Sequence, residues 1–356
     1  MPSKAALVST ISQYDGKDTM HFLITGHTGF KGAWLSLLLR ERGHQVSGIA
    51  LSHDVGALYN TAGIGKLLEN DIRCDIRSPG ELEEHFKVVG PDVVIHMAAQ
   101  ALVRESYKNP VSTFETNAIG TLNVLKASQA ISHLKAQLIV TTDKVYKNMD
   151  KSIGYIESEA LGGHDPYSAS KAMADIATQS WLSSFNNAPT AIARAGNVIG
   201  GGDICEDRLI TDLVKSYSLG LVPQLRAPNS VRPWQHVLDC LNGYLMLVDA
   251  LVIGNGEGAW NFGPDEEQNK TVSEVSDIAG KVWGFEPNWE QDSTNHPHEA
   301  SLLTLNSDKA RSKLGWQNKL NFEESVGWTI NWYKNVSNGA DPLELTLSNI
   351  REFQAK

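Results

Sequence analysis

The sequence predicts an α/β protein in which a doubly wound parallel sheet is joined to a smaller C-terminal α/β lobe. Short apolar runs alternate with helical segments between His21 and Val198, a pattern typical of parallel strands connected by crossover helices. A glycine-rich turn separates the first apolar run from the first helix. After Asn197 the alternation stops, and the remaining chain is richer in tryptophan and proline with irregular spacing. We expect this second half to cover the carboxyl ends of the strands, where such sheets bind ligands.

The glycine-rich turn predicts a dinucleotide site. The first strand is expected at His21–Thr25 and a buried helix at Ala33–Arg40. Of the three glycines between them, the first permits a tight turn, the second lets the backbone approach a pyrophosphate, and the third lets the helix pack closely on the strand. The free N–H groups and the dipole at the helix start favour phosphate charge. We therefore expect a Rossmann-type cofactor site that includes Gly26, His27, Thr28, Gly29, Phe30, Lys31 and Gly32.

Further strands and helices follow in regular alternation. Strands are expected at Gln45–Leu51, Asp71–Ile76, Val93–Ala99, Leu138–Thr142 and Thr190–Val198, and helices at Pro79–Val88, Asn109–Ala130 and Tyr167–Phe185. The uninterrupted apolar run that begins at Val93 is typical of a strand buried on both faces of a parallel sheet. The run ends with Ala98, Ala99 and Gln100. The small side chains at this end would let a cofactor pass close to the backbone.

The segments after the second and third strands favour NAD as the cofactor. Asp54 lies near the position that usually carries an acidic residue for the adenosine ribose, although about one turn late. The segment from Leu51 to Gly65 contains no Arg or Lys that would bind the 2′-phosphate of NADP. Asp75, with Ile76 beside it, ends the third strand, where its carboxylate either accepts from the adenine amino group or contacts only water.

Tyr167 and Lys171 form a possible acid–base pair. On a helix the two side chains lie on one face, one turn apart. A nearby ammonium lowers the pKa of a phenol from about 10 toward neutrality, so that the phenol can take a proton from a sugar hydroxyl. The alternative is a pair of unrelated residues on the helix surface. Thr142, at the end of the fifth strand, favours the chemical interpretation because that strand end can reach the same nicotinamide.

These motifs together resemble the extended short-chain dehydrogenases/reductases, and within them the nucleotide-sugar 4,6-dehydratases. That group usually carries Thr-Asp-Glu after the fifth strand, whereas Thr142-Asp143-Lys144 is similar to the CDP-glucose 4,6-dehydratase subfamily. The other stretches that carry the resemblance are Gly26–Gly32, Leu102–Tyr107, Arg194–Asp203 and Arg232–Val237. The similarity runs from about Thr19 to beyond Trp332 and leaves residues 1–18 as an N-terminal extension.

The resemblance implies a reaction without net redox change. Hydride passes from sugar C4 to NAD⁺, with Tyr167 as base and Thr142 hydrogen-bonded to the same oxygen. The new ketone acidifies the C5 proton, water is lost across C5 and C6, and hydride returns to C6. Asp143 protonates the departing C6 oxygen, which requires a raised pKa. Lys144 either removes the C5 proton as a neutral amine, with Lys171 as the nearby cation, or stays charged and stabilises the enolate.

The resemblance also implies the residues that bind CDP-D-glucose, which would become CDP-4-keto-6-deoxy-D-glucose. Arg104, Ser106 and Tyr107 are expected near the sugar, Asn197, Arg208 and Arg232 near the diphosphate, and His236 near the nucleotide. A guanidinium group suits a diphosphate because it donates in a bidentate manner. Any of these arginines could instead form a surface salt bridge, an alternative that is strongest for Arg226.

Composition narrows the class of protein. The chain has 356 residues and a formal net charge of −10, which argues against a general nucleic-acid binder. No apolar run reaches the length of a membrane span, and the first residues lack the apolar core of a signal peptide. Cys74, Cys205 and Cys240 lack the spacing of a zinc site or a disulfide framework. We expect a cytoplasmic enzyme without metal, nucleic-acid or membrane partners.

The expected organisation follows from these assignments. Residues 19–198 form the NAD-binding Rossmann domain, with a return segment at 236–262, and residues 199–235 and 263–356 form the substrate-binding lobe. A homodimer or homotetramer would pair through the helices at Asn109–Ala130 and Tyr167–Phe185. The alternatives are a dehydratase for another nucleotide sugar, a 4-epimerase, or a non-catalytic dinucleotide-sensing protein. An epimerase needs no acid at C6, and a sensor would tolerate loss of Tyr167 or Lys171.

Overall fold

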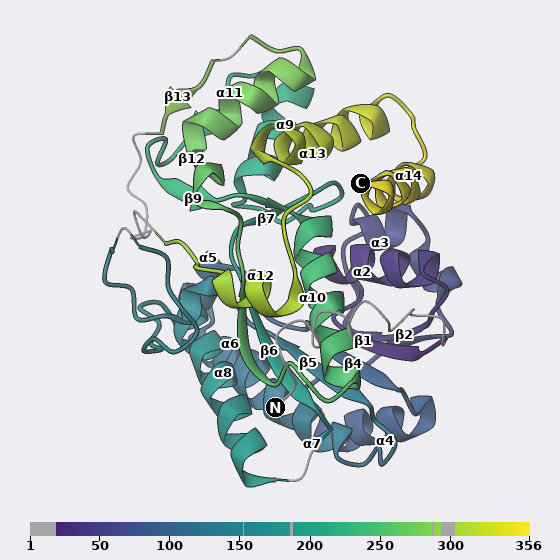
Figure 1. The fold of residues 1–356 in the computed structure, drawn as a ribbon. Helices are drawn as coiled ribbons and strands as arrows, with labels where there is room; N and C mark the ends of the chain where they lie inside the picture. The colour runs from purple at the N-terminus through teal and green to yellow at the C-terminus, as the bar shows by residue number, and fades with distance from the viewer. Residues whose placement is uncertain (1–18, 152, 186–187, 287, 293–302) are drawn as a thin grey trace.

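A seven-stranded parallel sheet forms the centre of the computed structural model, which describes residues 19–151, 153–185, 188–286, 288–292 and 303–356 (Figure 1). Its strands are β1 (His21–Thr25), β2 (Gln45–Ala50), β3 (Asn70–Arg73), β4 (Val93–His96), β5 (Ala136–Val140), β6 (Thr190–Ala195) and β11 (Gly258–Phe262). Their order is β11-β6-β5-β4-β1-β2-β3. The chain therefore reverses its winding direction between β1 and β4, which creates the crevice where such sheets bind ligands. The N-terminal extension expected over residues 1–18 lies outside the described residues.

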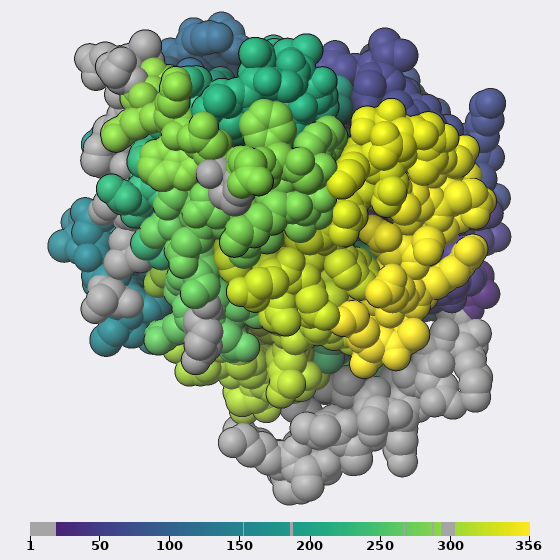
Figure 2. Space-filling model, turned by 90° about the horizontal axis from the view of Figure 1, so that it is seen from above, coloured from purple at the N-terminus to yellow at the C-terminus, as the bar shows by residue number. Residues whose placement is uncertain are grey.

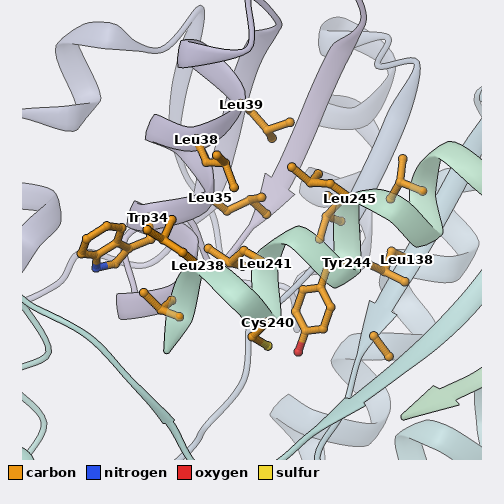
Figure 3. Close-up of a cluster of buried hydrophobic side chains, with 14 of the residues drawn as sticks. Trp34, Leu35, Leu38, Leu39, Leu138, Leu238, Cys240, Leu241, Tyr244 and Leu245 are labelled. Carbon is orange, nitrogen blue, oxygen red and sulfur yellow. The ribbon is translucent and has the colours of Figure 1, made fainter. Parts of the chain in front are cut away.

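Helices cover both faces of the sheet, as a doubly wound fold requires. They include α2 (Phe30–Glu41), α4 (Pro79–Val89), α7 (Gly120–Ser128), α8 (Pro166–Ser184) and α10 (Val237–Val252). On one face, Trp34 and the leucines of α2 pack against Leu238, Leu241 and Leu245 of α10 and against Leu138 of β5 (Figure 3). On the other face, α4 and α7 enclose a second apolar cluster with β1 and β4. The predicted Rossmann-type fold is confirmed.

The predicted helix at Asn109–Ala130 contains an irregular turn. It consists of α6 (Pro110–Phe114), the π-helical turn η2 (Glu115–Ile119) and α7. A π turn inside a helix shifts the direction of the side chains that follow, and such turns often occur at functional sites. Here it carries Asn117, which is buried beneath the loop that follows β4.

Predicted strands overran the observed ones at their carboxyl ends. The strand expected to reach Ile76 ends at Arg73, and the strand expected to reach Ala99 ends at His96. Apolar composition continues beyond the hydrogen-bonded ladder because these residues line a cavity. Composition reports burial, and it does not distinguish a buried strand from a buried loop.

The second half of the chain covers the carboxyl ends of the strands. Its elements are β7 (Val198–Ile199), α9 (Leu209–Ser218), β8 (Gln224–Leu225), β9 (Val231–Pro233), β10 (Gln235–His236), η4 (Glu266–Gln268), β12 (Asn269–Thr271), α11 (Val272–Trp283), β13 (Glu290–Gln291), α12 (Asp308–Leu314), α13 (Phe322–Ser337) and α14 (Pro342–Ala355). Figure 1 shows α9, α11 and α13 above the sheet. Apolar side chains of these three helices pack together in a separate cluster. Both α10 and β11 come from residues 236–262, so the chain returns to the sheet after α9.

The C-terminal helices also reach the N-terminal half. Figure 2 shows the last segment, in yellow, against the purple segment that contains α2. Arg351 on α14 forms a bidentate ion pair with Glu41 at the end of α2, with contacts of 2.8 and 3.2 Å. The remaining short helices are α3 (Leu58–Thr61), η1 (Ile64–Leu67), α5 (Val103–Lys108) and η3 (Asp143–Val145).

Candidate active site

A cavity of about 1350 Å³ opens at the carboxyl ends of the central strands. The residues that follow β1, β2, β4, β5 and β6 line one side of it, and α9 with residues 223–234 lines the other. It therefore lies between the sheet and the second half of the chain, at the place where doubly wound sheets bind ligands.

The glycine-rich turn forms the floor of this cavity. Gly26 has φ of 81°, and a Cβ there would lie 2.7 Å from the backbone nitrogen of Ala98. A Cβ at Gly32 would lie 2.2 Å from the carbonyl oxygen of Gly26. Side chains are thus excluded at both positions, and the first N–H groups of α2 remain available for phosphate oxygens. With Thr28, Gly29, Phe30 and Lys31, these glycines line the cavity and fit the predicted pyrophosphate site.

His27 is the exception within this turn, because its side chain points away from the cavity. The ring is buried beside Gly48, where a Cβ would lie 2.2 Å from Cγ of His27. Its Nε2 lies 2.7 Å from Oδ1 of Asp71, and Tyr59 and Arg73 complete the cluster. Burial lowers the pKa of His27. Only its backbone remains beside the predicted cofactor site.

The adenosine end of the cavity differs from the expected pattern. Leu51, Ser52 and His53 line it, whereas Asp54 is not among the lining residues. Asp75 lines it as predicted, but Arg77 holds its carboxylate with contacts of 3.0 and 2.6 Å to Oδ2. Arg77 also lines the cavity. Arg77 comes from the loop after β3, outside the segment from Leu51 to Gly65 in which the sequence has no Arg or Lys.

The loop after β4 is fixed by Asn117. Ala98, Ala99 and Gln100 line the cavity as predicted, with Ile76 nearby. Asn117 accepts from the backbone N–H of Gln100 at 2.8 Å and donates to its carbonyl at 2.9 Å. The same amide donates to Ser170 on α8 at 2.8 Å. The π turn therefore couples the loop after β4 to the helix that carries Tyr167.

Buried hydroxyl and imidazole groups align the ends of β1 and β4. His96 lies 2.6 Å from the hydroxyl of Thr25 and 2.9 Å from that of Thr121. Thr25 in turn accepts from the backbone N–H groups of Met97 and Ala98. Burial lowers the pKa of His96 to about 3, so the imidazole is neutral at physiological pH. This network holds the backbone that packs against Gly26.

All five predicted catalytic residues line the cavity: Thr142, Asp143, Lys144, Tyr167 and Lys171. Thr142 caps the η3 turn that carries Asp143 and Lys144, and its hydroxyl donates to Oδ1 of Asp143 at 2.9 Å. Asp165 caps α8 by accepting from the backbone N–H of Ser168 at 2.9 Å. The two caps bring the residues after β5 and the first turn of α8 to the same wall.

The prediction that Lys171 lowers the pKa of Tyr167 is wrong for the protein without bound ligands. Burial raises the pKa of Tyr167 to about 12, and the neighbouring Thr142 hydroxyl and then the charge of Arg208 oppose this rise. Lys171 instead donates to the carbonyl of Val140 at 2.8 Å. Burial and the charge of Lys31 lower the pKa of Lys171 to about 8. The spacing of Tyr167 and Lys171 predicts that they share one face of α8, but it does not predict which group the Lys171 ammonium contacts.

The carboxyl group of Asp143 has the properties of a general acid. It is 2 % exposed, and burial raises its pKa despite the opposing charges of Lys144 and Arg232. A Cβ on Gly196 would lie 2.8 Å from Oδ2 of Asp143, so the backbone after β6 closes over it. A protonated carboxyl group in this position can donate to an oxygen in the cavity.

The predicted substrate residues divide into two sets. Arg104, Asn197, Arg208 and Arg232 line the cavity. Two of these arginines contact carboxylates: Arg208 pairs with Asp203, and Arg104 lies 3.1 Å from Asp207. Asp207 adopts φ of 64°, outside the usual region for a residue with a side chain. The sequence does not predict that either carboxylate pairs with an arginine, because loop residues have no periodic signal.

Ser106, Tyr107 and His236 are not among the lining residues, so the structure does not support direct contacts with a substrate. Ser106 is buried and donates to the carbonyl of Val103 at 2.6 Å. Tyr107 is exposed on the outside of α5. His236 is buried between Trp34 and Trp328 and caps α10. Arg226, by contrast, lines the cavity while it donates to the carbonyl of Asp207 at 2.7 Å.

Neither a metal-binding cluster nor a membrane-spanning helix is present in the described residues. Within those ranges, no group of three or more His, Cys, Asp or Glu side chains is arranged to hold a metal ion. In the same part of the chain, no helix is both long enough and apolar enough to cross a membrane.

The relationship to known proteins follows from sequence similarity along nearly the whole chain. A sequence model of the family described as GDP-mannose 4,6 dehydratase matches residues 23–329. The chain belongs to this family. A CDP-glucose 4,6-dehydratase of Salmonella typhimurium is 40% identical over 346 residues, which cover 93% of this chain and 95% of the relative. A dTDP-glucose 4,6-dehydratase of Haemophilus influenzae is 25% identical over 339 residues, covering 88% of this chain and 98% of that protein. The resemblance to nucleotide-sugar 4,6-dehydratases is confirmed.

Solved structures of similar proteins share the fold. A dTDP-glucose 4,6-dehydratase from Streptomyces venezuelae, with NAD and TYD bound, has a TM-score of 0.79 at 23% identity and covers 91% of this chain and 100% of its own. A UDP-glucose 4-epimerase from Thermus thermophilus, in complex with NAD, has a TM-score of 0.77 at 25% identity and covers 90% of this chain and 100% of its own. Dehydratases and epimerases therefore share this architecture, and only the site can separate them.

Proposed function

We propose that this member of the GDP-mannose 4,6 dehydratase family is a hydro-lyase that converts CDP-D-glucose to CDP-4-keto-6-deoxy-D-glucose with loss of water. The observation that carries the proposal is the buried, easily protonated carboxyl group of Asp143 in the same cavity as Tyr167. Oxidation at C4 needs a base and a hydride acceptor, whereas loss of the C6 oxygen also needs an acid. The 40% identity to a CDP-glucose 4,6-dehydratase supports CDP-glucose as the substrate.

The proposed cofactor is NAD⁺. The glycine turn supports it, because side chains at Gly26 and Gly32 would fill the space that a pyrophosphate needs. Ala98, Ala99 and Gln100 would lie along the nicotinamide half, and Asp75 with Ile76 along the adenosine half. Bound there, NAD⁺ would accept hydride from sugar C4 and return it to C6.

The phenol of Tyr167 is proposed to act at the sugar C4 hydroxyl. Its oxygen takes the proton from that hydroxyl, while the Thr142 hydroxyl donates to the same sugar oxygen. The sequence places Tyr167 one helical turn from Lys171, whose ammonium can stabilise the phenolate once its contact with Val140 is exchanged. Because burial raises the phenol pKa to about 12, this positive charge is needed for proton transfer near neutral pH.

The carboxyl group of Asp143 is proposed to act at the C6 oxygen. The ketone at C4 makes the C5 proton acidic, and its removal expels the C6 oxygen as water once Asp143 has protonated it. The raised pKa favours the protonated form of this carboxyl group. Return of a proton to C5 and of hydride to C6 completes the product and restores the starting oxidation state.

Lys144 has two possible parts in elimination, and a substitution separates elimination from oxidation. It either removes the C5 proton or stabilises the enolate as a cation. In both cases we expect Lys144→Met to slow elimination by about 10²-fold or more while oxidation at C4 continues. Reduced nicotinamide should then accumulate, which absorbance measures directly. Lys147→Met, an equivalent change on the rim of the cavity, is the control. Equal loss of both steps would contradict the assignment.

The diphosphate is proposed to bind Arg208 and Arg232, with Asn197 beside them and Arg104 nearer the sugar. Arg208 is paired with Asp203 in this structure, so a diphosphate would exchange one anionic partner for another. The guanidinium would stay paired throughout this exchange, whereas the carboxylate of Asp203 would lose its cation and offset part of the binding energy. Ser106, Tyr107 and His236 are not included in this proposal, because their side chains do not line the cavity.

An isotope experiment tests the proposed reaction. The purified protein is incubated with CDP-glucose deuterated at C4, and the product is followed by NMR. We expect the deuterium at C6 of a 4-keto-6-deoxy sugar. A C4-inverted sugar would instead identify a 4-epimerase, and turnover of another nucleotide sugar in preference to CDP-glucose would identify a dehydratase of different base specificity. No turnover with several nucleotide sugars would favour the dinucleotide-sensing alternative.

We also propose a homodimer or homotetramer that pairs through α6, α7 and α8. Ile119 on η2, between α6 and α7, and Met173 and Ile176 on α8 are 49%, 48% and 52% exposed, and exposed apolar side chains on neighbouring helices favour an interaction surface there. We expect Ile176→Glu to convert the native oligomer to a monomer in light scattering after size-exclusion chromatography. Val88→Glu, at an exposed position on α4, should leave the oligomer intact. An unchanged mass for Ile176→Glu would rule out this interface.

The organisation proposed for the chain follows the same assignment. Residues 19–198 with 236–262 would bind NAD⁺, and residues 199–235 with 263–356 would bind the nucleotide sugar. The cytoplasm is the proposed location, which the unpaired thiols of Cys74, Cys205 and Cys240 support, because reducing compartments keep thiols free.

A further inference from the structure

A buried ion pair lies behind the candidate active site. Arg194 on β6 and Asp175 on α8 are 1% and 0% exposed, and two parallel contacts of 2.8 Å join the guanidinium to the carboxylate. Neither residue is among those that line the cavity. The pair therefore does not contact a substrate in the cavity. Its role must depend on the elements that it connects.

The carboxylate of Asp175 connects the catalytic helix to the end of β5. Asp175 lies one helical turn after Lys171 and two turns after Tyr167, on the same face of α8. Its Oδ2 accepts from the hydroxyl of Thr141 at 3.2 Å, directly before Thr142. Its Oδ1 accepts from Gln179 at 2.7 Å. Rotation of α8 about its axis would break the contacts of Asp175 with Thr141 and Arg194, so these two contacts fix the direction in which the phenol points.

The guanidinium of Arg194 connects the same helix to the turn after β5. Its Nη1 donates to the hydroxyl of Tyr146 at 2.8 Å and to the carbonyl of Glu157 at 3.1 Å. Tyr146 ends the η3 turn that carries Asp143 and Lys144. Its hydroxyl donates to Asn261 on β11 at 2.7 Å. One rigid, planar cation thus holds the turn, the edge of the sheet and α8 together.

Stability alone does not account for such a pair. An apolar pair of similar volume often stabilises a core as well as a buried ion pair does, because two charges lose their hydration on burial. A bidentate contact differs from apolar packing in fixing both distance and orientation. Catalytic groups need that kind of fixing, since a displacement of about 1 Å can lower a rate about 10²-fold.

We propose that Asp175 and Arg194 are positioning residues for the proposed dehydratase reaction: the pair holds α8, β6 and the η3 turn in the arrangement that presents Tyr167, Lys171 and Asp143 to one substrate. This inference rests on the proposed function for the reaction it serves. The contacts themselves do not depend on it.

The charge of Asp175 also acts on Lys171. It raises the pKa of that ammonium, against the lowering by burial and by Lys31. The charged or titratable groups that interact with Lys171 are Lys31 on α2, His96 on β4 and Asp175 on α8, and Arg194 on β6 is the partner of Asp175. Removing one member of the pair would leave the other as an unbalanced charge near Lys171. Loss of Asp175 leaves a positive charge and loss of Arg194 a negative one, so the two changes should shift the Lys171 pKa in opposite directions.

The test uses Asp175→Asn, Arg194→Gln and the double variant in the full chain. We expect each single variant to lower kcat for CDP-glucose by about 10–10²-fold with little change in KM, because neither side chain touches the substrate. The alkaline limb of the oxidation step should move to lower pH in Asp175→Asn, where Arg194 is unbalanced, and to higher pH in Arg194→Gln. The double variant should return the limb toward its wild-type position without restoring kcat.

A second measurement makes the test independent of the substrate. The NMR titration of the Lys171 side chain, assigned with Lys171→Met, should show the same opposite shifts from a wild-type pKa near 8. If a single variant does not fold, Asp175→Leu with Arg194→Met supplies an apolar pair that should fold yet stay slow. Arg311→Gln is the matched control, because Arg311 is paired to Asp265 outside the cavity.

The outcomes separate the two proposals. Wild-type kcat in either single variant, or shifts of the Lys171 titration in the same direction, would overturn the positioning role. Failure of the wild-type protein to convert CDP-glucose would overturn the proposed function, while the Lys171 titration would still decide whether the pair controls this site.

Discussion

Tyr167→Phe should lower turnover of CDP-glucose by about 10²–10⁴-fold, the usual range for removing a general base. The change deletes one oxygen and leaves the ring, so the cavity keeps its shape. NAD⁺ binding, measured by calorimetry, should remain within a few-fold of wild type because the glycine turn makes most of the proposed contacts. Reduced nicotinamide should not form in a single turnover, since the first step is the one that fails.

A matched tyrosine controls for general effects on folding. Tyr217 is buried in the second half of the chain and donates to the carbonyl of Ser276 at 3.1 Å. It is not among the residues that line the cavity. Tyr217→Phe should reduce stability slightly and leave kcat unchanged. A Tyr167→Phe enzyme that turned over at a near-normal rate would show that another group removes the proton.

Asp143→Asn should block elimination and spare oxidation. The amide keeps the shape of the side chain but cannot transfer a proton to the C6 oxygen, so we expect elimination to slow by about 10²–10⁴-fold. Wild-type elimination should fall as pH rises through the raised pKa of Asp143, because only the protonated form is an acid. This decrease should be absent from the residual activity of Asp143→Asn. Single-turnover absorbance separates the two steps.

Asp249 supplies a comparable carboxyl group for the control. Burial raises its pKa as it raises that of Asp143, but Asp249 is not among the cavity-lining residues. Asp249→Asn should leave both steps and their pH dependence unchanged. If Asp143→Asn slowed oxidation as much as elimination, the residue would serve substrate orientation and not proton transfer.

The sequence was sufficient to predict the central sheet and the wall of the cavity formed by the ends of its strands. Alternating apolar runs predicted β1 to β6 because parallel strands are buried on both faces and separated by helices. Gly26 and Gly32 were recognisable because a tight turn and a close approach of two backbones exclude every side chain. Tyr167 and Lys171 were recognisable because their spacing matches one helical turn.

Contacts between distant segments were not predictable from local pattern. The side chain of His27 turned toward Asp71, and that of His236 toward Trp34 and Trp328, because these partners come from other elements. The raised pKa of Tyr167 depends on burial that no spacing reports.

Contacts within the loops that line the proposed substrate side of the cavity were also not predictable from the sequence. The carboxylates of Asp203 and Asp207 meet arginines across these loops. Loops lack periodicity, so their residues become visible only in three dimensions.

The return of the chain to the sheet has a consequence for folding during synthesis. Strands β1 to β6 leave the ribosome first, but α10 and β11 follow only after α9 and the short strands beyond it. Until then β6 is an open edge, and the leucines of α2 lack their cover. The nascent polypeptide therefore exposes an apolar surface and an unpaired strand edge while residues 199–262 are translated. Chaperones would protect it from aggregation most effectively during this interval.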